Sequence, residues 1–350
     1  MTTNNVDKIL YLNRREVIQI CENIDVVDVI REAFVLHGSG QTVLPDEAYL
    51  GWTTELGETV RSLSLPGYLG GSLNSAGTKI INGNIANPSR GLPRASGLTM
   101  IYDSVSVRVN CVMESAYISS MRTAGVTALS AELFKGREIE RIALIGAGVL
   151  AQAHIELLAK TLPHLRTIRI YDISSERVAE LKANVDPVLK ARGIEWQEAA
   201  SAEEAIRATQ LIVPVTTTTT GYIQYDWLQP GAILVNISLD DALPEVVLRA
   251  DRVIVDDWKL VKDDPRRLIG RMYRAGQIIG PDESVANVKE NQRCIDAQLG
   301  DVVINGKGKR SHLDDIILVN PFGLAIEDVA LATHIYRNAL QAGVGTWLER

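Results

Sequence analysis

The sequence has little cysteine and no long apolar run, and both absences limit what the protein can be. Its three cysteines, Cys21, Cys111 and Cys294, are far apart and lack the spacing of metal ligands, so we expect neither a disulfide framework nor a metal site. No stretch of 18 apolar residues predicts a transmembrane helix, and the N-terminus lacks the order of a signal peptide. We therefore expect a cytoplasmic protein that does not enter a membrane.

A strong positive charge is also missing. The net charge at pH 7 is −7, and basic clusters such as Lys307-Gly-Lys309-Arg310 are short, which argues against a nucleic-acid partner. The chain contains no G-x-S-x-G motif of a hydrolase, and we interpret its five scattered histidines as structural or surface residues.

The most informative segment follows the apolar run Ile142–Ile145, which predicts a buried strand. The next six residues fill the pattern G-x-G-x-x-A, and a helix-forming stretch comes after them. In this pattern the first glycine permits a tight turn, the second lets a pyrophosphate approach the backbone, and the alanine lets the helix pack on the strand. The sequence therefore predicts a dinucleotide-binding turn; the alternative is the same turn without a ligand. Its residues are Gly146, Gly148, Val149, Leu150 and Ala151.

An acidic residue supports this interpretation. The segment Thr167–Tyr171 predicts the next strand and ends at Asp172, close to the place where an acid binds the ribose hydroxyls of the cofactor. Because a carboxylate repels a 2′-phosphate, Asp172 favours NAD over NADP, although Arg169 and Arg177 lie nearby.

From about residue 140 to 260, apolar strands alternate with helices, which predicts an α/β, doubly wound parallel sheet of the Rossmann type. The expected strands are 142–145, 167–171, 211–215, 232–237 and 252–256, and the expected helices are 149–160, 175–191 and a short one after Ser201. Thr216 and Ser238 follow two of these strands, where hydroxyls suit the ribose or phosphate of a cofactor; the less favoured alternative is that the run Thr216–Thr220 is a low-complexity accident.

The rest of the chain predicts a second, α+β domain. Strand character appears at 58–65, 76–82 and 97–103, after a helix at 26–36 that Asp25 begins as N-cap. Helices are also expected at 115–134 and 324–342.

Three charged residues lie in apolar surroundings: Lys79, Arg122 and Asp241. A buried charge is costly unless it is paired, so each one predicts either a salt bridge or a substrate contact. Together they suit a dehydrogenase that acts on a carboxylated amine, in which cations bind the carboxylates and an acid transfers protons. We interpret Glu327-Asp328 as an ordinary helix start.

In several motifs the chain resembles the ornithine cyclodeaminase/μ-crystallin family over nearly its whole length. The motifs are Gly77-Thr-Lys79-Ile, Gly91-Leu-Pro-Arg94-Ala-Ser-Gly, Ser119-Ser-Met-Arg122-Thr123-Ala, the glycine turn and Gly323-Leu-Ala-Ile-Glu-Asp328.

This resemblance implies a homodimer with two domains. Residues 1–120 and 324–350 would bind substrate and dimerise, and residues 121–323 would bind NAD. It further implies that Lys79 and Arg122 bind the substrate carboxylate, with Arg61 and Arg94 as weaker candidates, and that Asp241, with Lys79, is catalytic. The residues that would line the cofactor are Arg122, Thr123, Gly148, Val149, Asp172 and Gly323.

A narrower likeness, in Tyr222–Gly231, Asn236–Asp241, Val255–Trp258 and Asp314–Pro321, is to the branch of the family that makes 2,3-diaminopropionate for siderophores. It implies oxidative cleavage of N-(2-amino-2-carboxyethyl)-L-glutamate to 2-oxoglutarate and L-2,3-diaminopropionate. The alternatives are an amino-acid cyclodeaminase, an NAD(P)H-dependent imine or ketimine reductase, and a cofactor-binding protein without turnover. The apolar stretch Ile80–Asn87 keeps the reductase open, because it departs from that branch.

Overall fold

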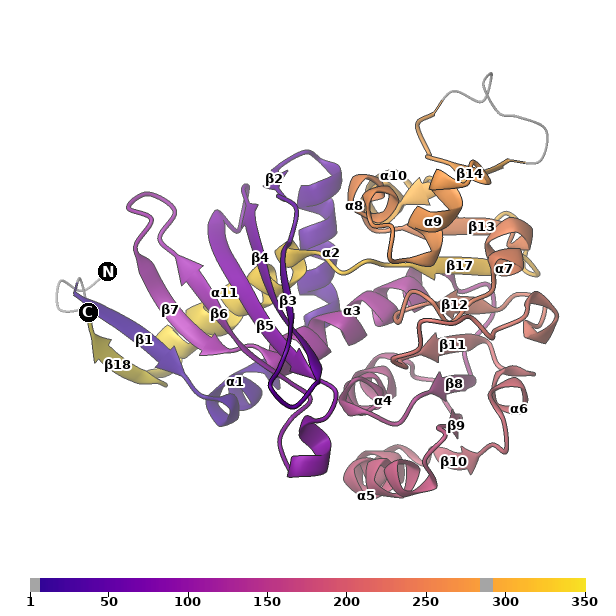
Figure 1. Cartoon of the computed structure of the whole chain (residues 1–350), viewed down its shortest axis with the longest axis horizontal. Helices are drawn as coiled ribbons and strands as arrows, with labels where there is room; N and C mark the ends of the chain where they lie inside the picture. Colours follow the sequence, from indigo (N-terminus) through magenta and orange to yellow (C-terminus); the bar gives the residue numbers. More distant parts are fainter. Residues whose placement is uncertain (1–6, 284–291) are drawn as a thin grey trace. The chain divides into compact units, whose positions relative to one another are not determined.

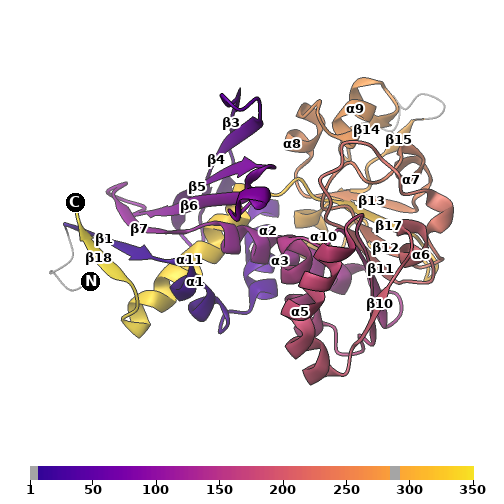
Figure 2. The same ribbon diagram turned by 60° about the horizontal axis from the view of Figure 1, so that its bottom comes forward.

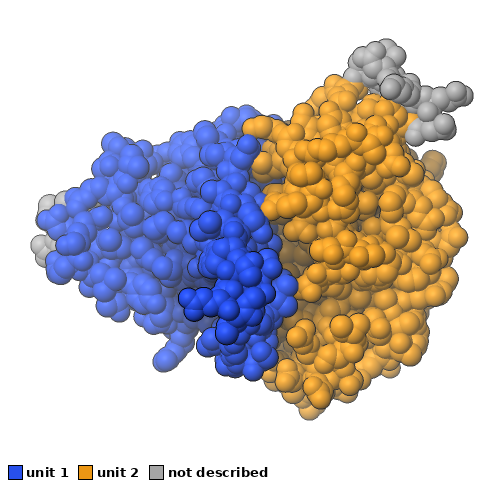
Figure 3. Space-filling view, in the orientation of Figure 1, with its two compact units in different colours: residues 1–122, 324–350 blue, residues 123–323 orange. Residues whose placement is uncertain are grey.

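The computed structural model describes residues 7–283 and 292–350, and these form two compact units (Figure 1). Unit 1 extends to Arg122 and resumes at Leu324, whereas unit 2 spans Thr123–Gly323 (Figure 3). Unit 1 is therefore assembled from the two ends of the chain.

The main sheet of unit 2 has eight strands in the order β10-β9-β8-β11-β12-β17-β13-β16, and each neighbouring pair is parallel. All residues of β11 and β17 are buried, as expected in a parallel sheet that is covered on both faces. The strands are β8 (Arg141–Ile145), β9 (Thr167–Tyr171), β10 (Glu195–Glu198), β11 (Leu211–Pro214), β12 (Ile233–Val235), β13 (Arg252–Val255), β16 (Ala297–Gln298) and β17 (Ile317–Asn320). A second, two-stranded sheet pairs β14 (Ile278–Ile279) with β15 (Arg293–Cys294).

The helices of unit 2 alternate with these strands. They are the larger part of α3 (Ala116–Phe134), α4 (Val149–Thr161), α5 (Ser175–Arg192), α6 (Ala202–Ile206), α7 (Pro244–Arg249), α8 (Trp258–Asp263), α9 (Leu268–Arg274) and α10 (Leu299–Asn305), with a 3₁₀ turn at Tyr225–Trp227. From β8 the chain proceeds outward to β9 and β10, and it then returns to the other side of β8 at β11 and β12. This reversal is the switch point at which doubly wound sheets bind ligands, so the predicted α/β class is confirmed.

Unit 1 contains a mixed sheet of eight strands in the order β18-β1-β7-β6-β5-β4-β2, with β3 also paired to β4 (Figure 2). The strands are β1 (Lys8–Leu12), β2 (Thr42–Val43), β3 (Ala48–Thr53), β4 (Thr59–Leu69), β5 (Ser75–Asn84), β6 (Ala95–Tyr102), β7 (Val109–Glu114) and β18 (Thr346–Glu349). The helices are α1 (Arg14–Cys21), α2 (Val26–Gly38) and α11 (Ala325–Ala342), with a 3₁₀ turn at Asn87–Arg90. Asp25 caps α2 as expected, because its side chain accepts a hydrogen bond from the Asp28 amide.

Helix α11 packs against β4, β5, β6 and α2, so the end of the chain completes the core of the first domain. Two glycines permit this close approach. A Cβ at Gly67 would lie 3.3 Å from Ile326, and one at Gly77 would lie 3.2 Å from Val329. Larger residues at either position would push the helix away from the sheet.

Some expectations about single elements were wrong. The strand expected at 232–237 is only Ile233–Val235, because the chain turns beyond it. The pattern analysis also missed β3, whose six residues are all exposed and show no alternation. Within the described ranges, no helix is long and apolar enough to cross a membrane.

His154 is fully buried on α4 and both of its ring nitrogens are engaged. Nδ1 donates to the Leu150 carbonyl at 2.7 Å, which leaves Nε2 to accept from the Thr127 hydroxyl at 2.9 Å. Burial lowers the pKa of His154 from 6.5 to about 4, although the hydrogen bond to Leu150 opposes this shift. His154 is thus a structural residue that stays neutral at pH 7.

We predict that this burial makes folding stability fall in acid. The unfolded chain binds a proton at His154 below pH 6.5, whereas the folded chain does so only near pH 4. Stability present above pH 6.5 should therefore be lost as the pH falls to 4, by roughly 3 kcal/mol from this residue. Urea unfolding at several pH values measures it. His154→Gln should remove this part of the slope, and His164→Gln, at an exposed position, should keep it. Equal slopes in all three proteins would contradict the prediction.

Candidate functional site

The predicted glycine turn lies at the carboxyl end of β8, beside the end of β11. Gly146 has φ +104°, and a Cβ there would lie 3.0 Å from the Val215 carbonyl oxygen, so the position requires glycine. Gly148 is exposed at the N-cap of α4 without a side-chain capping bond, and within the described structure a Cβ there would meet no atom within 4 Å. Open space at amides that begin a helix suits a phosphate group, so these residues fit a dinucleotide.

The rest of the turn follows the same pattern. Ala151 is fully buried, as its predicted packing requires, and the Val149 side chain is 64% exposed. Asp172, directly after β9, accepts hydrogen bonds from the Ala147 amide at 2.7 Å and the Ser174 amide at 2.9 Å. A carboxylate has about four acceptor positions, so these bonds orient Asp172 and leave capacity for ribose hydroxyls.

Asp241 is fully buried beyond the carboxyl end of β12. Its Oδ1 accepts hydrogen bonds from the Thr216 hydroxyl at 2.7 Å and the Tyr222 hydroxyl at 2.9 Å, whereas its Oδ2 has no hydrogen-bond partner among the described residues. Burial raises the pKa of Asp241 above its usual range, although the hydroxyls of Thr216, Tyr222 and Ser238 favour the ionised form. The raised pKa makes this carboxyl group a candidate to exchange protons during a reaction.

Of the two hydroxyls that sequence reasoning assigned to the cofactor, Thr216 is bound to Asp241, and Ser238 donates to the Pro214 carbonyl at 2.9 Å. Tyr222 was missed as an Asp241 partner, although it lies in a segment that carried the family resemblance. Gly323 has φ +94°, and its amide donates to Asp256 Oδ2 at 2.6 Å. Asp256 is fully buried, so it fixes the backbone of Gly323.

In unit 1, Lys79 and Arg122 are brought together by two buried acids. Lys79 Nζ lies 2.6 Å from Asp328 Oδ2. Arg122 Nη1 lies 2.7 Å from Glu327 Oε2, and its Nε lies 3.3 Å from Asp328 Oδ2. We call these four residues the charge quartet. The sequence left open whether each cation forms a salt bridge or contacts substrate. The structure shows that both Lys79 and Arg122 form salt bridges.

The quartet also corrects the interpretation of Glu327-Asp328 as an ordinary helix start. Both residues lie in the first turn of α11, but their side chains are fully buried against the cations. Burial lowers the pKa of Lys79, whereas the charge of Asp328 opposes that shift. In the sequence, the family motif that ends in Asp328 was the one sign that these two acids have a role beyond starting a helix. Arg61 on β4 and Arg94 just before β6 are both exposed.

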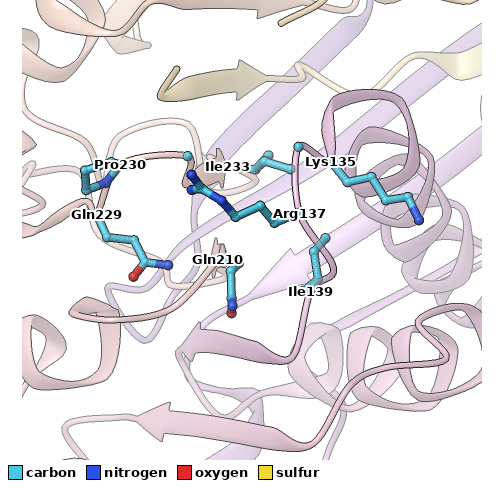
Figure 4. Close-up of a pocket in the computed structure, with 9 residues that line it drawn as sticks. Lys135, Arg137, Ile139, Gln210, Gln229, Pro230 and Ile233 are labelled. Carbon is cyan, nitrogen blue, oxygen red and sulfur yellow. The ribbon is translucent and has the colours of Figure 1, made fainter. Parts of the chain in front are cut away.

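A separate cavity of about 210 Å³ lies within unit 2, at the amino ends of β8, β11 and β12 (Figure 4). Arg137, Gln210 and Gln229 line it, and the Arg137 guanidinium pairs with Asp314 at 2.7 Å. None of the predicted site residues lines this cavity, which lies at the strand ends opposite to the glycine turn. In the part of the chain described, no group of three or more His, Cys, Asp or Glu side chains is placed to hold a metal.

A comparison with known protein families agrees with this fold and with these residues. The model of the ornithine cyclodeaminase/mu-crystallin family matches residues 9–343. The chain therefore belongs to the ornithine cyclodeaminase/mu-crystallin family, and the predicted resemblance is confirmed.

Individual relatives narrow the comparison. The chain is 32% identical, over 98% of both proteins, to N-((2S)-2-amino-2-carboxyethyl)-L-glutamate dehydrogenase of Staphylococcus aureus. The crystal structure of CmnK has a TM-score of 0.86 at 31% identity and 98% coverage of both chains. An archaeal alanine dehydrogenase dimer with bound NAD shares the fold, with a TM-score of 0.80 at 23% identity over 98% of this chain and 99% of that one. Proteins named as a cyclodeaminase and as ketimine or pyrroline-carboxylate reductases also match. These names support the oxidoreductase class, and they differ in the reaction.

We predict that Asp328→Asn destabilises the protein by about 3–5 kcal/mol, because it leaves buried Lys79 without its nearest counter-charge. The free energy of unfolding in urea measures this effect. Glu349→Gln is the matched control, since it breaks a 2.9 Å ion pair with Lys8 at a side chain that is 76% exposed. The same free energy for both variants would show that the quartet pairs contribute no more than surface pairs.

Proposed function

We propose that this chain cleaves N-(2-amino-2-carboxyethyl)-L-glutamate oxidatively to 2-oxoglutarate and L-2,3-diaminopropionate. The chain is an NAD-dependent oxidoreductase of its family. The observation that carries the choice of substrate is the full-length similarity to the staphylococcal dehydrogenase named for it. A place in diaminopropionate and siderophore synthesis belongs to the same proposal.

The proposed cofactor site is the turn and strand ends of unit 2. Gly148 leaves room for the pyrophosphate, and Asp172 accepts from the ribose hydroxyls and disfavours a 2′-phosphate. Bound NAD supplies the acceptor for the hydride of the substrate α-carbon. The further residues proposed to line it are Arg122, Thr123, Gly146, Val149, Leu150, Ala151, Thr216, Ser238 and Gly323.

Asp241 has the proposed role of proton carrier. Loss of hydride from the α-carbon of the glutamate part, and of the amine proton to solvent, leaves an imine, and water then adds to the imine carbon. Asp241 takes one proton from this water and passes it to the nitrogen, which gives a carbinolamine. It then moves the proton of the carbinolamine hydroxyl to the nitrogen as the carbon–nitrogen bond breaks, which gives the keto acid and the free amine. Oδ2, which has no hydrogen-bond partner among the described residues, is the atom that we propose exchanges these protons.

Lys79 and Arg122 have the proposed role of binding substrate carboxylates, with Arg61 and Arg94 as further candidates. Glu327 and Asp328 hold the two buried cations in fixed positions, which favours a defined orientation of the substrate.

The reaction is tested by absorbance of NADH with NAD and N-(2-amino-2-carboxyethyl)-L-glutamate, beside an ornithine control. We expect net NADH and 2-oxoglutarate from the first mixture only. Asp241→Asn should lower turnover roughly 10²- to 10⁴-fold with NAD affinity unchanged, whereas Asp226→Asn, which breaks an exposed pair with Arg249, should match the wild type. Ammonia and proline from ornithine without net NADH would instead identify a cyclodeaminase. NADPH-dependent reduction of cyclic imines, with both mixtures silent, would identify a reductase.

We also propose a homodimer in the cytoplasm, with contacts made by unit 1. Tyr49, Leu50 and Trp52 on β3 are 47–61% exposed, which is unusual for large apolar side chains on one strand. Sedimentation velocity should give twice the chain mass of 38.3 kDa, and Trp52→Glu should shift the protein toward the monomer. A wild-type monomer at micromolar concentration would refute the dimer.

A further inference from the structure

Asp240, the neighbour of the proposed proton carrier Asp241, forms hydrogen bonds with residues at the start of α9. The Asp240 side chain is 1% exposed. Its Oδ1 accepts from the Leu268 amide at 3.0 Å and from Arg271 Nη2 at 2.9 Å, and its Oδ2 accepts from Arg267 Nη1 at 3.2 Å. One buried carboxylate therefore fastens the start of α9 to the segment that follows β12. We call these contacts the Asp240 clamp.

The backbone next to the clamp has a conformation that needs support. Leu239 has φ +74°, which a residue with a side chain keeps only where its surroundings hold it. On the far side, the Asp241 carbonyl accepts from the amides of Tyr222 and Ile223 at 2.8 and 2.9 Å. A Cβ at Gly221 would lie 2.7 Å from the Ala242 carbonyl oxygen, so this segment is closely packed and leaves no room for a side chain at Gly221.

We propose that Asp240 is a positioning residue for Asp241: by binding Arg267, Arg271 and the Leu268 amide, it fixes the turn that directs the Asp241 carboxylate. The two neighbouring side chains have separate partners, Asp240 on α9 and Asp241 at Thr216 and Tyr222. Holding one side chain therefore limits the backbone rotation that would move the other. The inference rests on the proposed function, which gives Asp241 the proton transfer.

The clamp also has an electrostatic consequence. Burial is the largest influence on the pKa of Asp241 and raises it, the hydroxyls of Thr216, Tyr222 and Ser238 lower it, and the carboxylate of Asp240 adds a smaller increase. The negative charge of Asp240 raises the pKa of Asp241, and the arginines bound to Asp240 carry two positive charges. Replacing Asp240 with asparagine removes the negative charge and keeps both positive ones. The pKa of Asp241 should then fall.

The test compares Asp240→Asn and Asp240→Glu with the wild type, and uses Asp226→Asn as the control. In Asp240→Asn we expect kcat to fall roughly 10- to 100-fold with an unchanged KM for NAD, and the acid limb of the kcat–pH profile to move to lower pH. Asp240→Glu restores the charge and should recover part of kcat and the wild-type limb. Asp226→Asn should match the wild type. An unchanged kcat, or a loss with an unmoved limb and no recovery by glutamate, would overturn the proposal.

A second measurement separates this inference from the proposed reaction. If the wild type forms no NADH with any substrate offered, the proposed function fails, and hydrogen exchange then decides the clamp. Faster exchange at residues 236–243 and 264–275 in Asp240→Asn, but not in Asp226→Asn, supports it. Exchange in Asp240→Asn equal to that of the wild type overturns it.

Discussion

The salt bridges of the charge quartet join elements that are remote in the sequence, since Lys79 is on β5, Arg122 on α3, and Glu327 and Asp328 on α11. Burial of one of these charges alone would cost several kcal/mol, so each is tolerated only with its partners. Both carboxylates belong to the last helix of the chain. Lys79 and Arg122 are therefore held in place only when α11 is docked, so the assembly of unit 1 also positions these two proposed substrate-binding cations.

In unit 2, the neighbouring residues Asp240 and Asp241 are both buried carboxylates, but they are stabilised in different ways. Asp240 accepts hydrogen bonds from two guanidinium groups and an amide, which suits a fixed structural contact. Asp241 has only hydroxyl donors on one oxygen and no partner among the described residues on the other. Burial raises the pKa of Asp241, and a carboxyl group with a raised pKa can both accept and donate a proton during a reaction.

The sequence predicted those features that local pattern controls. The strand β8, the glycine turn at Gly146 and the helix α4 are encoded within about twenty consecutive residues, so their form and the α/β class followed from the spacing. The quartet could not be predicted in this way, because Lys79 and Asp328 are 249 positions apart and no periodicity relates them. Burial of each cation was predictable, since the surrounding residues are apolar, but the identity of its partner depends on tertiary packing. Asp240 and Asp241 form an Asp-Asp pair in the sequence, and only their neighbours in the fold distinguish them.

The family relationship identifies the class of reaction, whereas the particular reaction must be decided by the residues of the site. Proteins of this fold are named as dehydrogenases, reductases and a cyclodeaminase, so the fold does not choose the reaction. A nicotinamide that accepts or donates hydride, cations that bind a carboxylate and a proton carrier suit all of these reactions. The difference between these reactions must therefore arise from the groups that select the amine or imine bound beside them. The same groups must decide whether the imine is hydrolysed by water, is reduced, or is attacked by an amine of the same substrate to form a ring. The segment Ile80–Asn87 continues from the buried Lys79 along β5 and beyond its end, and its residues are half-buried or exposed, so it is a place where such selectivity can change while the quartet stays intact.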